Sequence, residues 1–235
     1  EQAAESFRQV VAVRPDDADA WYNLGTLSLR SNDLVQARAY LEKTVKLRPG
    51  YAEAWNNLGM LAAQQGAADE AIADFQQAIE QRPGYAVAML NLGNVYRRQH
   101  AWERAESSLK QALALQPEDA ETNFSLGMLY AQQQDQQRAE QYLRRAIDLR
   151  PDYAEALNNL GVLFARQQKL AQAEGEFKTA IKAAPGFDQS YLNLARLYAV
   201  QNDRTRAGEV LHQLLRLQPN NSSAKQALEI LQSGP

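Results

Sequence analysis

Asparagine recurs at one position of the chain at intervals of 34 residues, and its side chain is the one that could repeat the same chemistry along the molecule. The copies are Asn23, Asn57, Asn91, Asn159 and Asn193, with Ser125 in the remaining place of the series. A carboxamide carries both donors and an acceptor, so it matches the paired C=O and N–H of an extended peptide backbone. Each such bond contributes about 0.5–1.5 kcal/mol net. A row of these amides therefore predicts peptide binding that depends little on the sequence of the peptide.

The same asparagines also have a structural interpretation. Asparagine is a mediocre helix former, so helix propensity does not explain its recurrence. Each amide could instead tie one unit of the chain to the next, or bond a neighbouring backbone group. The residue types alone leave both interpretations open.

Side chains close to the asparagines are expected to select the side chains of a ligand. The residues immediately before the series positions are Tyr22, Asn56, Leu90, Phe124, Asn158 and Leu192. The residues nearly one helical turn further on are Thr26, Met60, Asn94, Met128, Val162 and Arg196. From these two sets we predict that Tyr22, Leu90, Asn94, Phe124, Met128 and Asn158 contact a peptide together with the five asparagines. Leu90, Phe124 and Met128 would make the middle of this surface apolar.

Catalytic chemistry is not expected. The two histidines, His100 and His212, stand in different units with no nucleophile pattern near either of them. No glycine-rich phosphate loop, metal-ligand spacing or nucleophile elbow occurs. The carboxylates fall on helical surfaces with partners one turn away, as Glu140 does with Arg144. We therefore predict a non-enzymatic chain that needs neither a cofactor nor a metal.

Composition excludes further classes. The 235 residues carry a formal net charge of -3, so no basic field attracts phosphate backbones and nucleic-acid binding is disfavoured. The chain has no cysteine, which rules out disulfides and thiolate metal sites. No apolar run reaches the length of a membrane span, the mean hydropathy is -0.52, and residues 1–14 do not resemble a signal peptide. Membrane association is thus not expected, and a cytoplasmic location is favoured.

The elements that must position the asparagines are helices whose ends are marked by proline. Seven prolines follow one another at the same interval of 34 residues: Pro15, Pro49, Pro83, Pro117, Pro151, Pro185 and Pro219. Proline lacks an N–H and restricts the residue before it, so it ends helices. Between two prolines lie two amphipathic patterns, such as Ala52–Gln64 and Asp69–Gln81, and neither shows the alternation of a strand. The chain is predicted to be all-α.

These patterns divide the chain into one array of units. Six complete helix–turn–helix repeats are expected at 18–51, 52–85, 86–119, 120–153, 154–187 and 188–221. Residues 1–17 supply only the second helix of a truncated repeat, and residues 222–235 form a C-terminal capping helix. Each repeat has a small residue in both helices, such as Gly59 and Ala71, which favours close approach of the pair. One pair cannot bury both of its apolar sides, so the repeats must stack.

The repeat resembles the tetratricopeptide repeat (TPR) family. The residues that carry the resemblance are Trp55, Leu58, Gly59, Ala62, Ala71, Phe75, Ala78 and Pro83, and only Ala62 departs from the signature. The resemblance implies a right-handed superhelical solenoid of stacked antiparallel helix pairs, in which the first helices line a concave groove. The asparagine series itself resembles the TPR arm of O-linked N-acetylglucosamine transferases, where such a ladder holds substrate polypeptides. Ser125 departs from that ladder, and the catalytic domain of those enzymes has no counterpart in this chain.

One other TPR type does not match. Members that clamp a terminal carboxylate place lysine where this chain has Tyr22, and further basic residues where it has Val87 and Asn91. A carboxylate clamp at these positions is therefore not expected.

The leading hypothesis is a non-catalytic scaffold that binds an extended peptide or a partner protein in its groove. One alternative is an assembly scaffold whose convex faces or uncapped ends make homo-oligomers. Another is the substrate-recognition arm of a larger enzyme, such as a protein glycosyltransferase, because residues 1–17 lack the first helix of their repeat.

Overall fold

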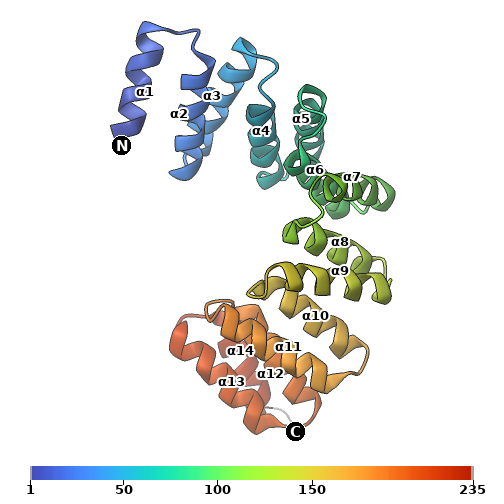
Figure 1. Ribbon diagram of the computed structural model, residues 1–235. Coiled ribbons are helices and arrows are strands. Elements are labelled where there is room, and N and C mark those ends of the chain that lie inside the picture. The colour runs from blue at the N-terminus through green and yellow to red at the C-terminus, as the bar shows by residue number, and fades with distance from the viewer. Residues whose placement is uncertain (1, 234–235) are drawn as a thin grey trace. The chain divides into compact units, whose positions relative to one another are not determined.

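The structure, a computed structural model, describes residues 2–233, which form fourteen helices and no strand (Figure 1). The helices are α1 Gln2–Val13, α2 Ala18–Arg30, α3 Leu34–Leu47, α4 Ala52–Gln64, α5 Ala68–Gln81, α6 Ala86–Arg98, α7 Trp102–Leu115, α8 Ala120–Gln132, α9 Gln136–Leu149, α10 Ala154–Arg166, α11 Leu170–Ala183, α12 Asp188–Val200, α13 Arg204–Leu217 and α14 Ser222–Ser233. The predicted all-α class is confirmed.

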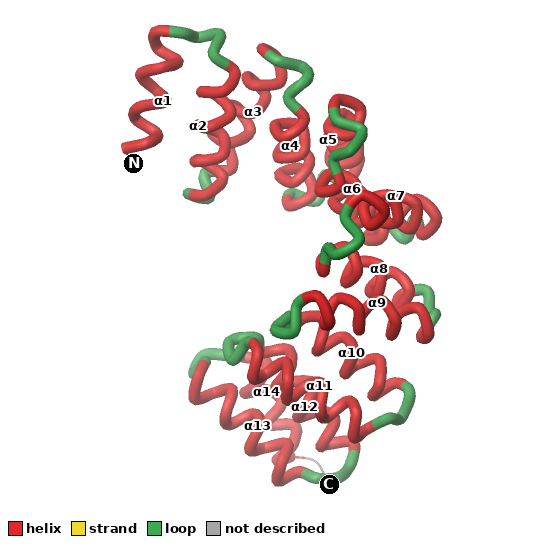
Figure 2. The backbone as a smooth tube through the Cα atoms, viewed as in Figure 1, coloured by secondary structure: helices red, strands yellow, loops and turns green. Residues whose placement is uncertain are grey.

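The helices pack as successive antiparallel pairs. Within the described residues the pairs are α2–α3, α4–α5, α6–α7, α8–α9, α10–α11 and α12–α13, while α1 packs on α2 and α14 packs on α13 and α12. Figure 2 shows that only short loops join one helix to the next. The predicted stacking of helix pairs is confirmed.

The chain divides into two compact units, and each is described by itself. The first ends at Pro117 and holds α1–α7 of the described helices, and the second begins at Glu118 and holds α8–α14. In the first unit a buried cluster joins Leu41 of α3 to Leu58 of α4. In the second unit a comparable cluster joins Leu211 of α13 to Leu228 of α14.

Close contact inside each pair explains the glycine of the first helix. A Cβ atom added to Gly59 would lie 2.8 Å from the ring of Phe75, and one added to Gly161 would lie 2.6 Å from the ring of Phe177. No side chain fits at that distance, so the glycine offsets its poor helix propensity by admitting a large side chain of the second helix. Ala195 stands in the same place in α12 and contributes to a buried cluster with the smaller Leu211.

The turn inside each pair uses one residue in the left-handed region. Among the described residues these are Asn32, Gly66, His100, Gln134, Gln168 and Asn202, with φ between 59° and 78°. The next N–H then reaches back into the first helix, as Asp33 N does to Ser28 O at 2.9 Å, which is the bond of a Schellman cap. The break expected at Gly66 is therefore the same turn in all six pairs, and His100 belongs to one of these turns.

Candidate interaction surface

The predicted contact residues lie on one face of each first helix, at positions separated by three, four and seven residues. We call this face the first-helix stripe. In the first unit it consists of Asp19, Tyr22, Asn23 and Thr26 on α2, Glu53, Asn56, Asn57 and Met60 on α4, and Val87, Leu90, Asn91 and Asn94 on α6. In the second unit it consists of Glu121, Phe124, Ser125 and Met128 on α8, Glu155, Asn158, Asn159 and Val162 on α10, and Gln189, Leu192, Asn193 and Arg196 on α12.

Two of the asparagines bond to the first helix of the preceding repeat. Asn91 Nδ2 donates to Asn56 Oδ1 at 3.0 Å in the first unit. Asn193 Nδ2 donates to Asn158 Oδ1 at 2.9 Å in the second unit. Asn56, Asn158 and Asn193 are buried. The series therefore contributes to the stacking of repeats, as the structural interpretation of these residues expects.

The other asparagines have different internal partners. Burial raises the pKa of the Tyr22 phenol, and the nearby Asn57 amide, one repeat later, opposes that rise. Asn23 Nδ2 donates to its own helix at Asp19 O (2.8 Å), and Asn159 Nδ2 donates in the same way to Glu155 O (2.7 Å). The residue one repeat before Asn159 that corresponds to Tyr22 or Asn56 is Phe124, which has no polar atom to offer. For Asn91, Asn159 and Asn193 the partner therefore depends on the residue type at the corresponding position of the preceding repeat.

These internal bonds leave much of the hydrogen-bonding capacity of the amides unused. An asparagine side chain has two N–H donors and one carbonyl oxygen, and each bond above uses one N–H. Asn23, Asn57, Asn91 and Asn159 are half-buried, so their remaining groups are within reach of solvent. Asn193 differs because it is buried and also accepts from Gln189 Nε2 at 3.3 Å. The series thus presents four partly accessible amides, and internal bonds already fix the orientation of three of them, Asn23, Asn91 and Asn159.

Aromatic rings from the loops before α4 and α10 extend the stripe. Tyr51 stacks on Tyr22 with ring centroids 4.7 Å apart, and Tyr153 lies 5.0 Å from Phe124. A guanidinium from the same loop covers each outer ring, with Arg150 lying 4.2 Å from the centroid of Tyr153. Sequence reasoning missed these loop tyrosines. Their signal is an Arg-Pro pair followed two residues later by tyrosine, which recurs at Tyr51, Tyr85 and Tyr153.

The phenols of this surface stay neutral. Burial raises the pKa of Tyr22 and of Tyr85, and it raises the pKa of Tyr153 to about 12. At neutral pH these hydroxyls therefore keep their protons and act as uncharged donors and acceptors. The hydrogen bond from Arg48 (2.8 Å) lowers the pKa of the Asp19 carboxyl, so that carboxylate is charged and paired.

The apolar residues of the stripe differ in how accessible they are. Leu90 is only 6% exposed, whereas Met60 and Val87 are 49% and 43% exposed. Phe124 and Met128 are half-buried, and Asn94 is half-buried and accepts from Arg97 Nε at 3.4 Å. Met60 and Val87 are therefore the most exposed apolar side chains among the described residues of the first unit's stripe, and sequence reasoning left both out of the predicted contact set.

The two units repeat the same order of side chains, three repeats apart. The residues before the series positions read aromatic, asparagine, leucine in both units: Tyr22, Asn56 and Leu90, then Phe124, Asn158 and Leu192. The large residues of the second helices follow the same order: Leu41, Phe75 and Leu109, then Leu143, Phe177 and Leu211. The boundary between the compact units falls between these two blocks. Each unit thus has its own three-helix stripe, and the two stripes share this order at one of their four positions.

Two other kinds of site were sought in the described part of the chain. Residues 2–233 contain no group of three or more histidines, cysteines or carboxylates arranged to hold a metal ion. No helix in that range has both the length and the apolar character needed to cross a membrane.

Stacked helix pairs of this size, in which a small residue of the first helix meets a large residue of the second, define a tetratricopeptide repeat protein. A family model described as the cilia and flagella-associated protein 70 C-terminal domain matches residues 1–230, and the chain belongs to this family. The tetratricopeptide repeat fold is typical of protein-interaction scaffolds, and the similar structures are generally non-catalytic. No curated protein sequence matches the chain.

Solved structures share the fold over most of the chain. A chain of the APC/C hetero-tetramer Cut9–Hcn1 is similar with a TM-score of 0.82 at 21% identity, covering 98% of this chain and 46% of that one. PilF of Pseudomonas aeruginosa has a TM-score of 0.75 at 22% identity and covers 91% and 97%. YrrB, described as a TPR protein with an unusual peptide-binding site, has a TM-score of 0.57 at 24% identity and covers 80% and 97%. The chain thus spans just under half the length of the first of these proteins.

Replacing Asn193 by alanine is expected to destabilise the second unit by about 1–3 kcal/mol, because the buried Oδ1 of Asn158 then loses its donor. The matched control is Asn159→Ala, which removes only a bond to the same helix at a half-buried position and gains helix propensity. Urea unfolding of both variants would check this difference. Equal effects would mean that the amide pair contributes nothing to stacking.

Proposed function

We propose that the chain is a non-catalytic interaction module that binds an extended segment of a partner protein along the first-helix stripe of a unit. The backbone of that segment is held by the unused donors and acceptors of the asparagine series. The observation that carries the proposal is the set of half-buried amides that internal bonds already orient, Asn23 and Asn91 in the first unit and Asn159 in the second, with Asn57 as a further half-buried amide of the first unit.

Fixed orientation is what makes these amides suited to a ligand. A flexible side chain loses conformational freedom when it binds, at a cost of about 0.5–1.5 kcal/mol. An amide that already donates one N–H inside the protein has lost that freedom on folding. Its second N–H and its oxygen then bind a peptide group at little further cost. The internal bonds therefore support a binding role as well as a stacking role.

The other residues of the stripe would contact the side chains of the bound segment and so select among them. Tyr22, Phe124, Met128 and Asn94 are half-buried and supply partly accessible surface beside the amides. Leu90 and Asn158 are buried and act from beneath this surface, by setting its shape and by fixing Asn193. Met60 and Val87 add exposed apolar area in the first unit.

Two likenesses support this assignment. The asparagine series resembles that of the TPR arm of O-linked N-acetylglucosamine transferases, where the ladder holds polypeptide backbones. YrrB, which shares the fold, is itself described as having a peptide-binding site. The same backbone-holding role fits the amides of this chain.

Selection from a display library of random short peptides, followed by calorimetry, tests the proposal. Asn57→Ala combined with Asn159→Ala is expected to weaken the selected peptides by about tenfold or more, because each lost bond is worth about 1 kcal/mol. Asn220→Ala, which removes an exposed amide outside the stripe, is the matched control and should leave affinity unchanged.

Two results would overturn the proposal. If the selected peptides bind the double variant as tightly as they bind the parent protein, their binding site lies outside the asparagine series. A molar mass that rises with concentration in light scattering, with no peptide selected, would instead support an assembly scaffold.

A further inference from the structure

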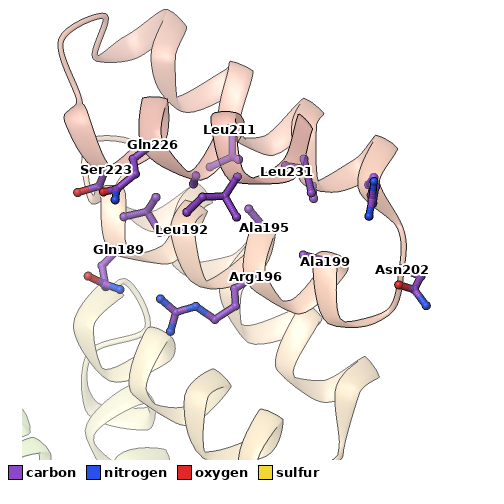
Figure 3. A pocket seen from close by; sticks show the side chains of 14 residues that line it. Gln189, Leu192, Ala195, Arg196, Ala199, Asn202, Leu211, Ser223, Gln226 and Leu231 are labelled. Carbon is purple, nitrogen blue, oxygen red and sulfur yellow. The ribbon is translucent and has the colours of Figure 1, made fainter. Parts of the chain in front are cut away.

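A cavity of about 680 Å³ opens between α12, α13 and α14 in the second unit (Figure 3). All three helices supply apolar lining, for example Leu192 of α12, Leu211 of α13 and Leu231 of α14. The volume lies within the range of about 300–1,000 Å³ that is usual for ligand pockets. The cavity is therefore large enough to take a side chain of a bound partner.

The cavity has a specific cause in the sequence. Between α10 and α12, Asn193 reaches across to Asn158 and fills the space between the two first helices. One repeat later the corresponding residues are Leu192 on α12 and Ala227 on α14, and both line the cavity. A methyl group at Ala227 cannot reach across as the amide does. The asparagine series thus ends in a hollow, and this hollow continues the first-helix stripe.

The charged residues of the lining are all cationic. Among the described residues that line the cavity, Arg196 and Arg204 carry charge and none is aspartate or glutamate. The remaining polar groups are uncharged amides and a hydroxyl, such as Gln189 and Ser223. Figure 3 shows the Arg196 side chain running along the edge of the cavity toward Gln189. An exposed guanidinium beside an amide favours a carboxylate, because both can donate to it.

We propose that this cavity binds an aliphatic side chain of a partner segment, with the acidic side chain of a neighbouring residue held by Arg196. This inference rests on the proposed function, since the same segment follows the stripe. The lining continues to Ile230, which is 65% exposed on α14. Apolar surface for the segment therefore extends beyond the hollow, which favours a segment that continues along α14 and carries its anionic group on a side chain.

Peptides selected from the random library test this site. The pool selected by the parent protein should be enriched in aspartate or glutamate next to leucine, isoleucine or methionine. Ala227→Leu places a branched side chain in the cavity where the partner's aliphatic side chain would lie and should weaken binding of the pool by about tenfold or more, and Arg196→Gln should remove the preference for the acidic residue. Ala171→Leu, an exposed alanine of α11, is the matched control and should change nothing.

The outcomes separate this site from the wider proposal. If Ala227→Leu and Arg196→Gln bind the pool like the parent, while Asn57→Ala with Asn159→Ala does not, the cavity proposal fails and the proposed function stands. If all of these variants bind the pool as tightly as the parent protein, both the cavity proposal and the proposed function fail. A melting temperature for Ala227→Leu below that of the parent would indicate misfolding, and the exposed Arg196→Gln would then decide the test.

Two further results would also overturn the cavity proposal. Peptides that lose binding when their C-terminus is amidated would mean that a terminal carboxylate occupies the site. A concentration-dependent rise in molar mass that Ala227→Leu abolishes would mean that a second copy of the chain occupies it.

Discussion

Gly161→Val is expected to destabilise the second unit by about 3 kcal/mol and to lower its melting temperature by roughly 10 °C. A Cβ atom at Gly161 would lie 2.6 Å from Phe177 Cε1 and 2.8 Å from Cδ1, and valine adds two further carbons to that space. Phe177 is buried on all sides, so its ring has no free volume into which to move. The two helices of the pair must therefore separate. Thermal and urea unfolding monitored by circular dichroism measure the loss.

The chain offers a matched control on the next helix. Gly175 lies within α11, but none of the described atoms stands within 4 Å of a Cβ added there. Gly175→Val should be neutral or slightly stabilising, because glycine is a poor helix former. If the two valine variants unfold alike, the contact between glycine and the aromatic ring does not explain the recurrence of glycine.

A rescue variant tests the same contact from the other side. In α12 the equivalent residue is Ala195, and its partner in the second helix is Leu211 instead of phenylalanine. Gly161→Ala combined with Phe177→Leu copies that arrangement. The double variant should be more stable than the sum of the two single effects predicts, because the buried cluster of Ala195 and Leu211 shows that a methyl group and leucine pack together at these positions.

The fold could be predicted because its causes are local and repeat. The helix expected at Ala52–Gln64 is observed at those residues as α4, since proline, the small residues and the apolar spacing all act within one repeat. The turns are local as well. Each of the six has one residue with a left-handed backbone conformation, but only at Gly66 did the residue type predict that conformation.

The candidate site was harder to predict, because its contacts join different repeats. Asn159 and Asn193 stand in similar local sequences, yet one bonds its own helix and the other bonds Asn158. What decides between them is the residue one repeat earlier, phenylalanine in one case and asparagine in the other. That residue type was visible in the sequence, but its distance from the amide was not. The cavity could not be predicted from the sequence for a related reason. It lies where Ala227 has a methyl group in place of the amide that Asn193 carries one repeat earlier.

The correspondence of repeats three apart was also visible in the sequence, but comparison of neighbouring repeats hides it. Tyr22 differs from Asn56 and resembles Phe124, and the structure shows that both aromatic residues pack against a loop tyrosine. The two units therefore share more than a general repeat. Both have the order aromatic, asparagine, leucine at the stripe position before the asparagine series, although the fourth stripe position differs throughout, and this shared order carries a consequence for binding.

A partner with two copies of one binding motif is expected to bind about 10²–10⁴-fold more tightly than a partner with one copy. The reason is that each unit has its own three-helix stripe, so the second motif binds within a complex already formed. Single-motif peptides should occupy two sites per chain in calorimetry. Peptides selected by the Ala227→Leu variant suit this test, because that variant obstructs a cavity that belongs to the second unit.

The design compares a single-motif peptide with tandem peptides joined by glycine–serine linkers of increasing length. Affinity should pass through a maximum as the linker comes to match the span between the two stripes. Asn57→Ala alters only the first unit and Asn159→Ala only the second, so either variant should abolish most of the gain while one site keeps its full affinity. Asn220→Ala should keep the whole gain. A stoichiometry of one peptide per chain, with no gain at any linker length, would mean that the two units build a single site. The shared order of side chains would then reflect packing alone, because leucine and phenylalanine alternate in the cores of both units in the same order.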